Sequence, residues 1–197
     1  MIVLAFDIAY QSGFAVTAPD SPHGVIWGHF GGVASDGLNY EVGRHENGIG
    51  RGLYDFRRNL DEILKAHSGV QVIAWERPIQ ASRHSAVFDE YQKAAIGLLR
   101  LACFERGLFP LPCDMKAVRK HFVGSGSARD AKIQVFQRCQ VLGYACKNDD
   151  ESDAIATWDY ATGVMKARAY ASHATGFGGK GMSAAAARRR ARGHSRL

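Results

Sequence analysis

The sequence predicts an α/β fold built on a mixed β-sheet, and three observations lead to this prediction. Short runs of β-branched, aromatic and aliphatic residues fill the first part of the chain and are separated by turn residues, which is typical of an antiparallel meander. Further along, apolar residues recur at helical spacing. Two more short apolar runs alternate with these helical segments. Strands that alternate with helices favour parallel pairing, so the whole pattern indicates helices packed on a mixed sheet.

The first three strands are predicted at residues 2–9, 14–18 and 25–34. A Gln-Ser-Gly turn at residues 11–13 is expected to separate the first two, and a link that contains Pro and Gly separates the second from the third. Residues 36–50 have the composition of a loop. Because the links are short, these three strands are predicted to be antiparallel.

A helix is predicted from Arg51 to just before Gly69, because its apolar positions recur every three or four residues. The next run, VQVIAWE, is short and apolar, and a proline follows it closely. It is therefore predicted to be a buried strand that ends at Glu76. A second helix is predicted over residues 85–105, where a single apolar stripe ends before a glycine.

The run LFPLPC, residues 108–113, predicts a strand at a sheet edge, because its two prolines lack the N–H that a central strand needs. A basic segment and a Gly-Ser loop follow, and then a helix is predicted over residues 128–141. The last helix is predicted to begin in the acidic run NDDESDAIATW, which starts at Asn148. Residues from about 170 on are rich in Gly, Ala and Arg, and this composition predicts an extended or disordered tail.

The composition indicates a globular chain with one core, since 46% of its 197 residues are hydrophobic and 22% are charged. We expect one domain over residues 1–168 and a basic, flexible tail over residues 169–197. No run is apolar over the thickness of a bilayer, and the N-terminal apolar run has no basic start. We therefore expect no membrane contact, no export and a cytoplasmic location. The four cysteines show no paired spacing and are expected to be reduced, mostly buried thiols.

The net charge of +6 is distributed unevenly. After Asp159 the chain has eight bases and no acid, so residues 1–159 are slightly acidic and the basic character belongs to the tail. Residues 116–138 are a local exception, with six bases around the single acid Asp130. Such a segment suits the phosphates of a nucleic acid, although a solvated helix face has the same composition.

Two carboxylates lie where a globular core does not favour them. Asp7 interrupts the apolar strand VLAFDIA, where an unpaired buried acid would cost several kcal/mol. Glu76 ends the strand VIAWE, which is predicted to lie beside the first strand. If the two strands are neighbours, both carboxylates converge on one end of the sheet. An exposed strand end is the alternative for Glu76.

The acidic run that opens the last helix holds four acids, Asp149, Asp150, Glu151 and Asp153. Capping and the helix dipole explain one or two of them. Asp150 and Asp153 are separated by three residues and share one helix face, so they can point at a common target, whereas Glu151 faces elsewhere. Asp149 is an alternative to Asp150, because the local sequence allows a shift of one residue.

Carboxylates that gather in an oxygen-only site suit Mg²⁺, with Mn²⁺ able to substitute, and two ions about 4 Å apart would activate a water and stabilise a leaving oxygen. Zinc is disfavoured because no His and Cys spacing fits it. Lys132 lies one helical turn or less from Asp130 and could approach the scissile phosphate. Lys116, Arg119 and Lys120 could hold the flanking backbone.

The order of these residues resembles that of the RuvC-type Holliday junction resolvases, which belong to the ribonuclease H-like nucleases. The resemblance covers residues 1–162 and is carried by four motifs: FDIAYQSGFAV with an Asp and a later Gly, VIAWERP with a strand-end Glu, the segment FVGSGSARDAKIQV, and DDESDAIA at a helix start. The last two motifs in combination are the more specific ones.

The resemblance implies a five-stranded ribonuclease H-like sheet, a homodimer, and divalent-metal-dependent nicking of branched DNA, especially four-way junctions. It implies a catalytic and metal-binding set of Asp7, Glu76, Asp150 and Asp153, with Lys132 as a base that assists cleavage and Lys116 as a DNA contact. The remaining candidate DNA contacts are Arg119, Lys120, Arg129, Ile79 and Arg83.

The dimer surface is expected on the helix predicted over residues 85–105. Three apolar residues of that helix fall off its main core stripe, namely Phe88, Leu99 and Phe104. Apolar side chains outside the core stripe are available to a second copy of the chain.

Two features depart from the family pattern. Family members from bacteria tend to carry an aromatic residue three positions after the strand-end Glu, and here that position is Ile79, which can wedge between bases but cannot stack on them. The Arg-rich tail is also outside the pattern, which indicates a divergent, phage-like member.

Two other functions stay open on the sequence. A ribonuclease H-like nuclease that acts on flaps or RNA–DNA hybrids would use the same acids, because the metals set the chemistry and the surface sets the substrate. A non-catalytic nucleic-acid-binding protein is the other, because the tail alone could bind phosphates. Asp7 in an apolar strand argues against a decayed site.

Overall fold

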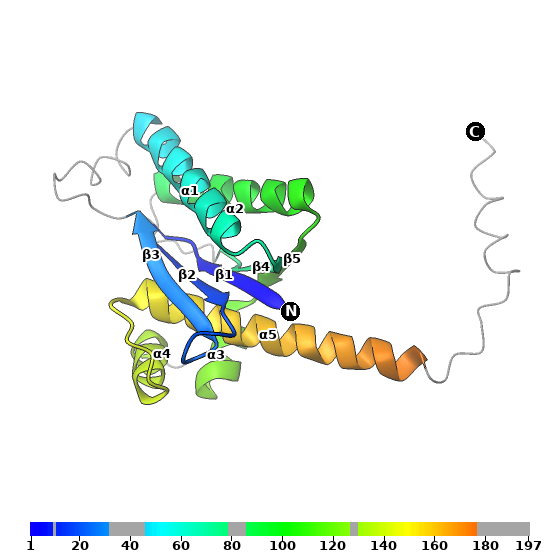
Figure 1. The fold of residues 1–197 in the computed structure, drawn as a ribbon. Helices are drawn as coiled ribbons and strands as arrows, with labels where there is room; N and C mark the ends of the chain where they lie inside the picture. Colours follow the sequence, from blue (N-terminus) through cyan, green and yellow to red (C-terminus); the bar gives the residue numbers. More distant parts are fainter. Residues whose placement is uncertain (10, 32–45, 79–85, 127–129, 177–197) are drawn as a thin grey trace, which may run out of the picture. The chain divides into compact units, whose positions relative to one another are not determined.

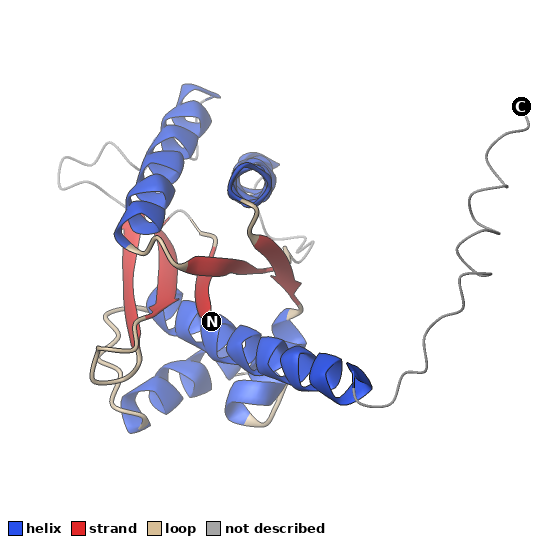
Figure 2. Ribbon diagram, turned by 45° about the vertical axis from the view of Figure 1, so that its right-hand side comes forward, coloured by secondary structure: helices blue, strands red, loops and turns tan. Residues whose placement is uncertain are grey.

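A computed structural model describes all residues except 10, 32–45, 79–85, 127–129 and 177–197. The described residues form a five-stranded sheet with helices on both faces, as Figures 1 and 2 show. The strands are β1 (Ile2–Asp7), β2 (Gln11–Thr17), β3 (Val25–Gly31), β4 (Val70–Glu76) and β5 (Phe109–Cys113). The helices are α1 (Glu46–Ala66), α2 (Ala86–Arg106), α3 (Met115–Val123), α4 (Ala131–Val141) and α5 (Asp149–Gly176).

The sheet has the order β3-β2-β1-β4-β5. The first three strands are antiparallel, while β4 pairs in parallel with β1 and β5 pairs in parallel with β4. This confirms the predicted fold class, a mixed α/β sheet in which β1 and β4 are central neighbours. The prolines of β5 lie at an edge, as expected, because an edge strand loses no ladder hydrogen bond on its outer side.

Three of the predicted boundaries are wrong. Residues 11–13 belong to β2, because Gly13 pairs with both neighbouring strands. Residues 46–50 begin α1 and are not part of a loop. Residues 170–176 continue α5, where alanines favour the helix over an irregular chain. The remaining part of the predicted tail, residues 177–197, lies outside the described residues.

Helix α3 is not among the predicted elements, which include only a basic segment at this place. Its signals are nevertheless present in the sequence. Asp114 is the N-cap and accepts a hydrogen bond from the Ala117 amide, and Val118 and Phe122 are buried four residues apart on one face. A glycine in the left-handed conformation, Gly124, ends the helix.

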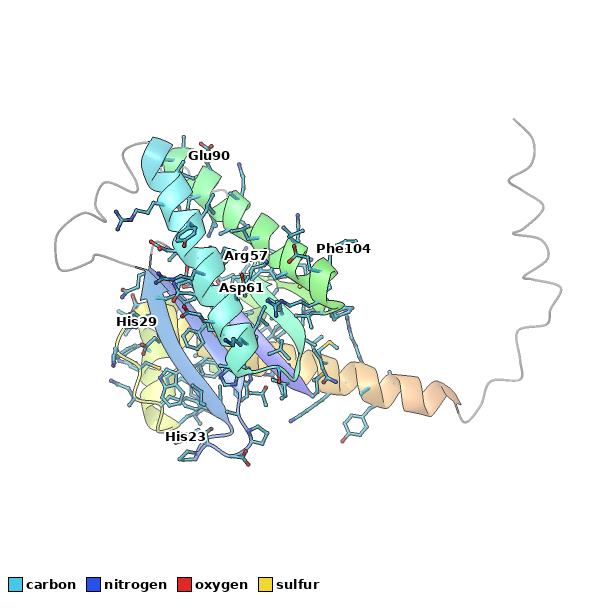
Figure 3. The ribbon with its side chains drawn as sticks, turned by 45° about the horizontal axis from the view of Figure 1, so that its top comes forward. His23, His29, Arg57, Asp61, Glu90 and Phe104 are labelled. Carbon is cyan, nitrogen blue, oxygen red and sulfur yellow. The ribbon has the colours of Figure 1, made fainter. Side chains whose placement is uncertain are left out.

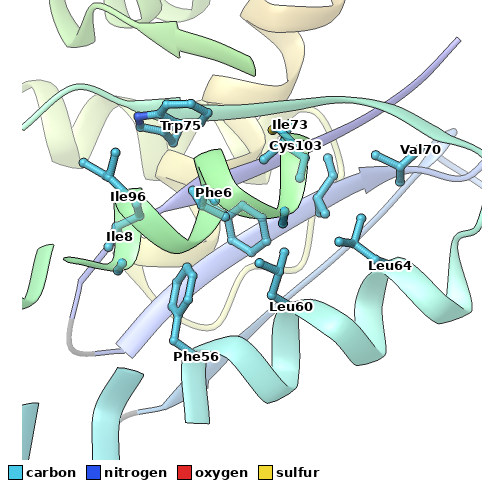
Figure 4. Close-up of a cluster of buried hydrophobic side chains, with 14 of the residues drawn as sticks. Phe6, Ile8, Phe56, Leu60, Leu64, Val70, Ile73, Trp75, Ile96 and Cys103 are labelled. Carbon is cyan, nitrogen blue, oxygen red and sulfur yellow. The ribbon is translucent and has the colours of Figure 1, made fainter. Parts of the chain in front are cut away.

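The main core lies between one face of the sheet and the helices α1 and α2 (Figure 4). Phe6 of β1 and Trp75 of β4 are buried there against Phe56 and Leu60 of α1. Leu99 of α2 is fully buried in the same core. The expectation that Leu99 lies off the core stripe and is available to a partner is therefore wrong.

The N-terminal half of α5, with α3 and α4, covers the opposite face of the sheet (Figure 1). Ala154 and Ile155 of α5 are fully buried, and Trp158 donates a hydrogen bond from Nε1 to Oγ1 of Thr17 on β2 at 2.9 Å. Buried contacts of this kind hold the helix on the sheet and thereby fix where its first turn lies.

Residues Met1–Thr162 form one unit, and the chain from Gly163 on is a second unit that begins inside α5. The predicted division at residue 168 stays a prediction. All four cysteines are free thiols, and Cys103, Cys113 and Cys139 are buried, as expected. No helix within the described ranges has both the length and the apolar character to cross a membrane.

Candidate active site

Strand alternation decides which face of the sheet the predicted acids occupy. Leu4 and Phe6 of β1 point into the core beneath α1 and α2. Asp7 therefore points to the opposite face, beneath α5. The same alternation in β4 sends Trp75 to the core and Glu76 to the α5 face.

These residues lie in one row across the sheet. Asp7 pairs with Gly13 of β2, and Gly13 pairs with His29 of β3. On the other side, Phe6 pairs with Trp75, so Asp7 and Glu76 are the next residues along neighbouring parallel strands. The strand ends therefore bring the two acids together from positions far apart in the sequence, as predicted.

Gly13 is the point at which α5 touches this row. A Cβ atom at Gly13 would lie 1.9 Å from the carbonyl oxygen of Asp150, which no side chain could tolerate. The backbone of the first turn of α5 therefore rests directly on β2, next to Asp7. This close approach explains why a glycine lies inside strand β2.

Asp153 and Thr157 continue the same face of α5 toward Glu76. The hydroxyl of Thr157 donates to Oε1 of Glu76 at 3.3 Å. Asp153 is buried, and its Oδ2 lies 3.7 Å from Nζ of Lys132 on α4. Thr157 was not among the predicted site residues, although its position four residues after Asp153 places it on the same helix face.

The four predicted acids perturb one another electrostatically. Burial, followed by the charges of Asp153, Glu76 and Asp150, raises the pKa of Asp7 well above its ordinary value. Burial and then Asp153 raise the pKa of Glu76 to about 7. The pKa values of Asp150 and Asp153 are also raised, again mainly by burial. Burial and mutual repulsion therefore make it costly to ionise all four carboxyls together unless a cation offsets their charge.

Two cations partly offset this charge. Burial lowers the pKa of Lys132, but the charges of Asp153 and Asp7, together with weaker ones from α5, outweigh it and the pKa is raised. Lys132 is therefore an ammonium ion at neutral pH. Arg119 of α3 lowers the pKa values of Glu76 and Asp153, and its Nε is buried without a hydrogen-bond partner among the described residues. Arg119, expected to contact DNA, thus also acts on the acids.

The donor set suits a divalent cation, because a hard cation binds carboxylate oxygens and would favour the ionised form of four acids whose burial raises their pKa values. Within the described part of the chain, however, no three His, Cys, Asp or Glu side chains lie close enough together to hold a metal ion. The acids thus share one electrostatic site without forming a ready-made coordination shell.

The acids at the start of α5 lie in different surroundings. Asn148 caps the helix by accepting from the Glu151 amide at 2.9 Å. Glu151 is buried and points away from the cluster, as expected, toward His29 of β3. Asp149 is exposed, while Asp150 is half-buried and is the one of the two that acts on the pKa of Asp7.

The other predicted DNA contacts lie in two groups. Lys116 and Lys120 are exposed on α3 and are available to solvent. Ile79, Arg83 and Arg129 lie outside the described residues. Whether any of these five residues touches DNA stays a prediction.

No protein-family model matches the chain, and no curated protein matches it in sequence. Solved structures do match it. RuvC from Thermus thermophilus is 18% identical, with a TM-score of 0.53 over 81% of this chain and 92% of that one. T. thermophilus RuvC in complex with Holliday junction substrate is 16% identical, with a TM-score of 0.55 over 81% and 91%. The yeast mitochondrial Holliday junction resolvase Ydc2 is 14% identical, with a TM-score of 0.49 over 80% and 76%. The likeness to RuvC shows that the chain has the RuvC fold.

Proposed function

We propose that this protein is a metal-dependent endonuclease that hydrolyses phosphodiesters in branched DNA, with the four-way junction as its main substrate. One observation carries the proposal. In a chain with the RuvC fold, Asp7, Glu76, Asp150 and Asp153 come from two central strands and one helix on the same side of the sheet, and Asp7 interacts electrostatically with the other three. Acids so costly to bury together are expected to serve a cation.

The four acids are the proposed ligands of two Mg²⁺ ions, with Mn²⁺ able to substitute. Two such ions, when bound, supply an activated water and stabilise the leaving oxygen of a phosphodiester. Thr157 orients Glu76 through the hydrogen bond that its hydroxyl donates. Because the acids do not yet form a coordination shell, the proposal requires their side chains to draw together when ions bind.

Lys132 and the bases of α3 are the proposed phosphate contacts. Lys132 is charged and more than half exposed, so its Nζ can leave Asp153 and approach a phosphate oxygen beside the acids. Lys116 and Lys120 are exposed on the neighbouring helix and can hold the DNA backbone on either side.

A homodimer follows from the substrate, because a four-way junction has two equivalent scissile strands and a two-fold pair presents one site to each. The outer face of α2 supports this assembly. Phe104 is 86% exposed and Leu101 is 45% exposed on that helix, and Figure 3 shows Phe104 near its end. Exposed apolar side chains on one helix are typical of a surface that a partner covers.

The direct test is cleavage of a labelled panel: a four-way junction, a flap and an RNA–DNA hybrid, each with Mg²⁺, Mn²⁺ or EDTA. We expect paired nicks in the junction with either metal and none with EDTA. The variant Asp7→Asn should bind the junction and fail to nick it.

The other outcomes identify the alternatives. Faster cleavage of flaps or hybrids than of the junction would make the protein a different ribonuclease H-like nuclease. Junction binding without cleavage under any metal would make it a binding protein and would refute the proposal.

A further inference from the structure

Glu151 is the acid at the start of α5 that the proposed reaction does not use. Its side chain is 2% exposed, and both of its carboxylate oxygens are paired. Oε1 lies 2.6 Å from Nδ1 of His29, and Oε2 accepts from the Lys147 amide at 2.7 Å. A buried carboxylate is tolerated only when such partners replace its lost hydration, so both bonds are needed to keep Glu151 inside.

His29 connects this buried acid to the row of strand ends. It lies on β3, where Figure 3 labels it, and it pairs with Gly13, which in turn pairs with Asp7. Alternation places His29 on the α5 face of the sheet. The bond from His29 to Glu151 therefore joins α5 to the same row of the sheet that carries Asp7.

Glu151 lies between two of the proposed metal ligands, so its bond to His29 affects their positions. Asp150 precedes Glu151 directly, and Asp153 follows it by two residues, so a side chain held at Glu151 also restrains the directions in which these two acids point. The contact at Gly13 limits how closely the turn approaches the sheet. The His29–Glu151 bond adds a side-chain constraint at the first turn itself, beyond the buried contacts that hold the rest of the helix.

We propose that His29 and Glu151 are positioning residues, which fix the first turn of α5 so that Asp150 and Asp153 face Asp7 and Glu76. Without His29, Glu151 would be buried with one oxygen unpaired, and the turn would be driven toward solvent. The metal-binding part of this inference rests on the proposed function, whereas the ordering of the turn does not.

The test compares four proteins: wild type, His29→Leu, His29→Asn and the control His121→Leu. Leu removes the donor, whereas the Asn amide places an N–H near the position of Nδ1. The control removes a second histidine–carboxylate pair that holds α5, since Nε2 of His121 lies 3.0 Å from Oδ2 of Asp159, away from the cluster. The control thus reports the general cost of loosening the helix.

Two measurements are made on each protein. The first is amide hydrogen exchange over residues 147–153. The second is Mn²⁺ affinity in the absence of DNA, measured by electron paramagnetic resonance. In His29→Leu, we expect exchange to be about tenfold faster or more, and Mn²⁺ to bind about tenfold more weakly, because a hydrogen bond to a charged group is removed. His29→Asn should recover most of both effects. His121→Leu should change neither.

Unchanged exchange and unchanged Mn²⁺ affinity in His29→Leu would overturn the inference while leaving the proposed function in place. Absence of Mn²⁺ binding by the wild type would overturn the proposed function and the metal-binding part of the inference with it. If His29→Leu does not fold, His29→Phe replaces it, because the Phe ring fills the space of the imidazole and has no N–H to donate to Glu151. Wild-type behaviour of that variant would also overturn the inference.

Discussion

The raised pKa of Glu76 predicts how the stability of the protein changes with pH. Burial, with the charge of Asp153, raises the pKa of its carboxyl from 4.5 to about 7. The folded protein therefore holds the Glu76 proton more tightly than the unfolded chain does. The stabilisation that this proton gives to the folded state is fully present below pH 4.5. This stabilisation is lost as the pH rises to about 7.

The variant Glu76→Gln should consequently gain stability at alkaline pH when metal is absent. We expect its free energy of unfolding in EDTA to exceed that of the wild type by up to about 3 kcal/mol at pH 8, from about 1.4 kcal/mol per pKa unit, and to match it near pH 4. Urea denaturation at several pH values measures this. Glu62→Gln, at an exposed position on α1, is the control and should show no such trend. A pH-independent difference for Glu76→Gln would contradict the assigned burial.

Gly13 carries the second prediction at the residue scale. Ala at this position would place its Cβ against the carbonyl of Asp150, so β2 or α5 must move. We expect Gly13→Ala to lower the free energy of unfolding by about 1–3 kcal/mol and to weaken Mn²⁺ binding. Gly50→Ala, where the added Cβ meets nothing within 4 Å, should raise it by about 0.5–1 kcal/mol instead. Equal effects of the two substitutions in urea denaturation would show that α5 does not rest on β2.

At the scale of the elements, the sequence predicted structure correctly where a residue type at a given position has only one common structural explanation. An acid inside an apolar strand, a proline-rich edge strand and an acid pair on one helix face led to Asp7, to β5 and to Asp150 with Asp153. His29 and Thr157 were not predicted, because their importance comes from residues more than eighty positions away. Such pairings depend on sheet order and helix docking, which local spacing does not encode.

The outer face of α2 carries a prediction about assembly. Phe104 is exposed there, and an acid at its centre would oppose burial against a second copy. We expect wild-type protein to sediment as a dimer at micromolar concentration and Phe104→Glu to sediment as a monomer with an unchanged melting temperature. Tyr54→Glu, at an exposed position on α1, should remain dimeric. A monomeric wild type, with or without DNA, would refute the proposed dimer.

At the scale of the whole molecule, the distribution of charge separates binding from chemistry. Residues 177–197 contain six bases and no acid, whereas residues 1–159 are slightly acidic. Deleting residues 177–197 should weaken DNA binding and flatten its dependence on log salt by about 0.9 for each phosphate that the shortened protein no longer neutralises. Cleavage at saturating protein should persist. An unchanged salt slope would assign phosphate binding to Lys116, Lys120 and Lys132 instead.

The central claim is that four carboxylates from β1, β4 and α5 form one divalent-metal site. Anomalous diffraction from crystals grown with Mn²⁺ tests it directly and also separates Asp150 from Asp149. We predict one or two manganese peaks bounded by Asp7, Glu76, Asp150 and Asp153, with metal–oxygen distances of about 2.1–2.2 Å, and no peak in Asp7→Asn crystals. Manganese bound elsewhere, or no peak among these acids at millimolar Mn²⁺, would contradict the claim.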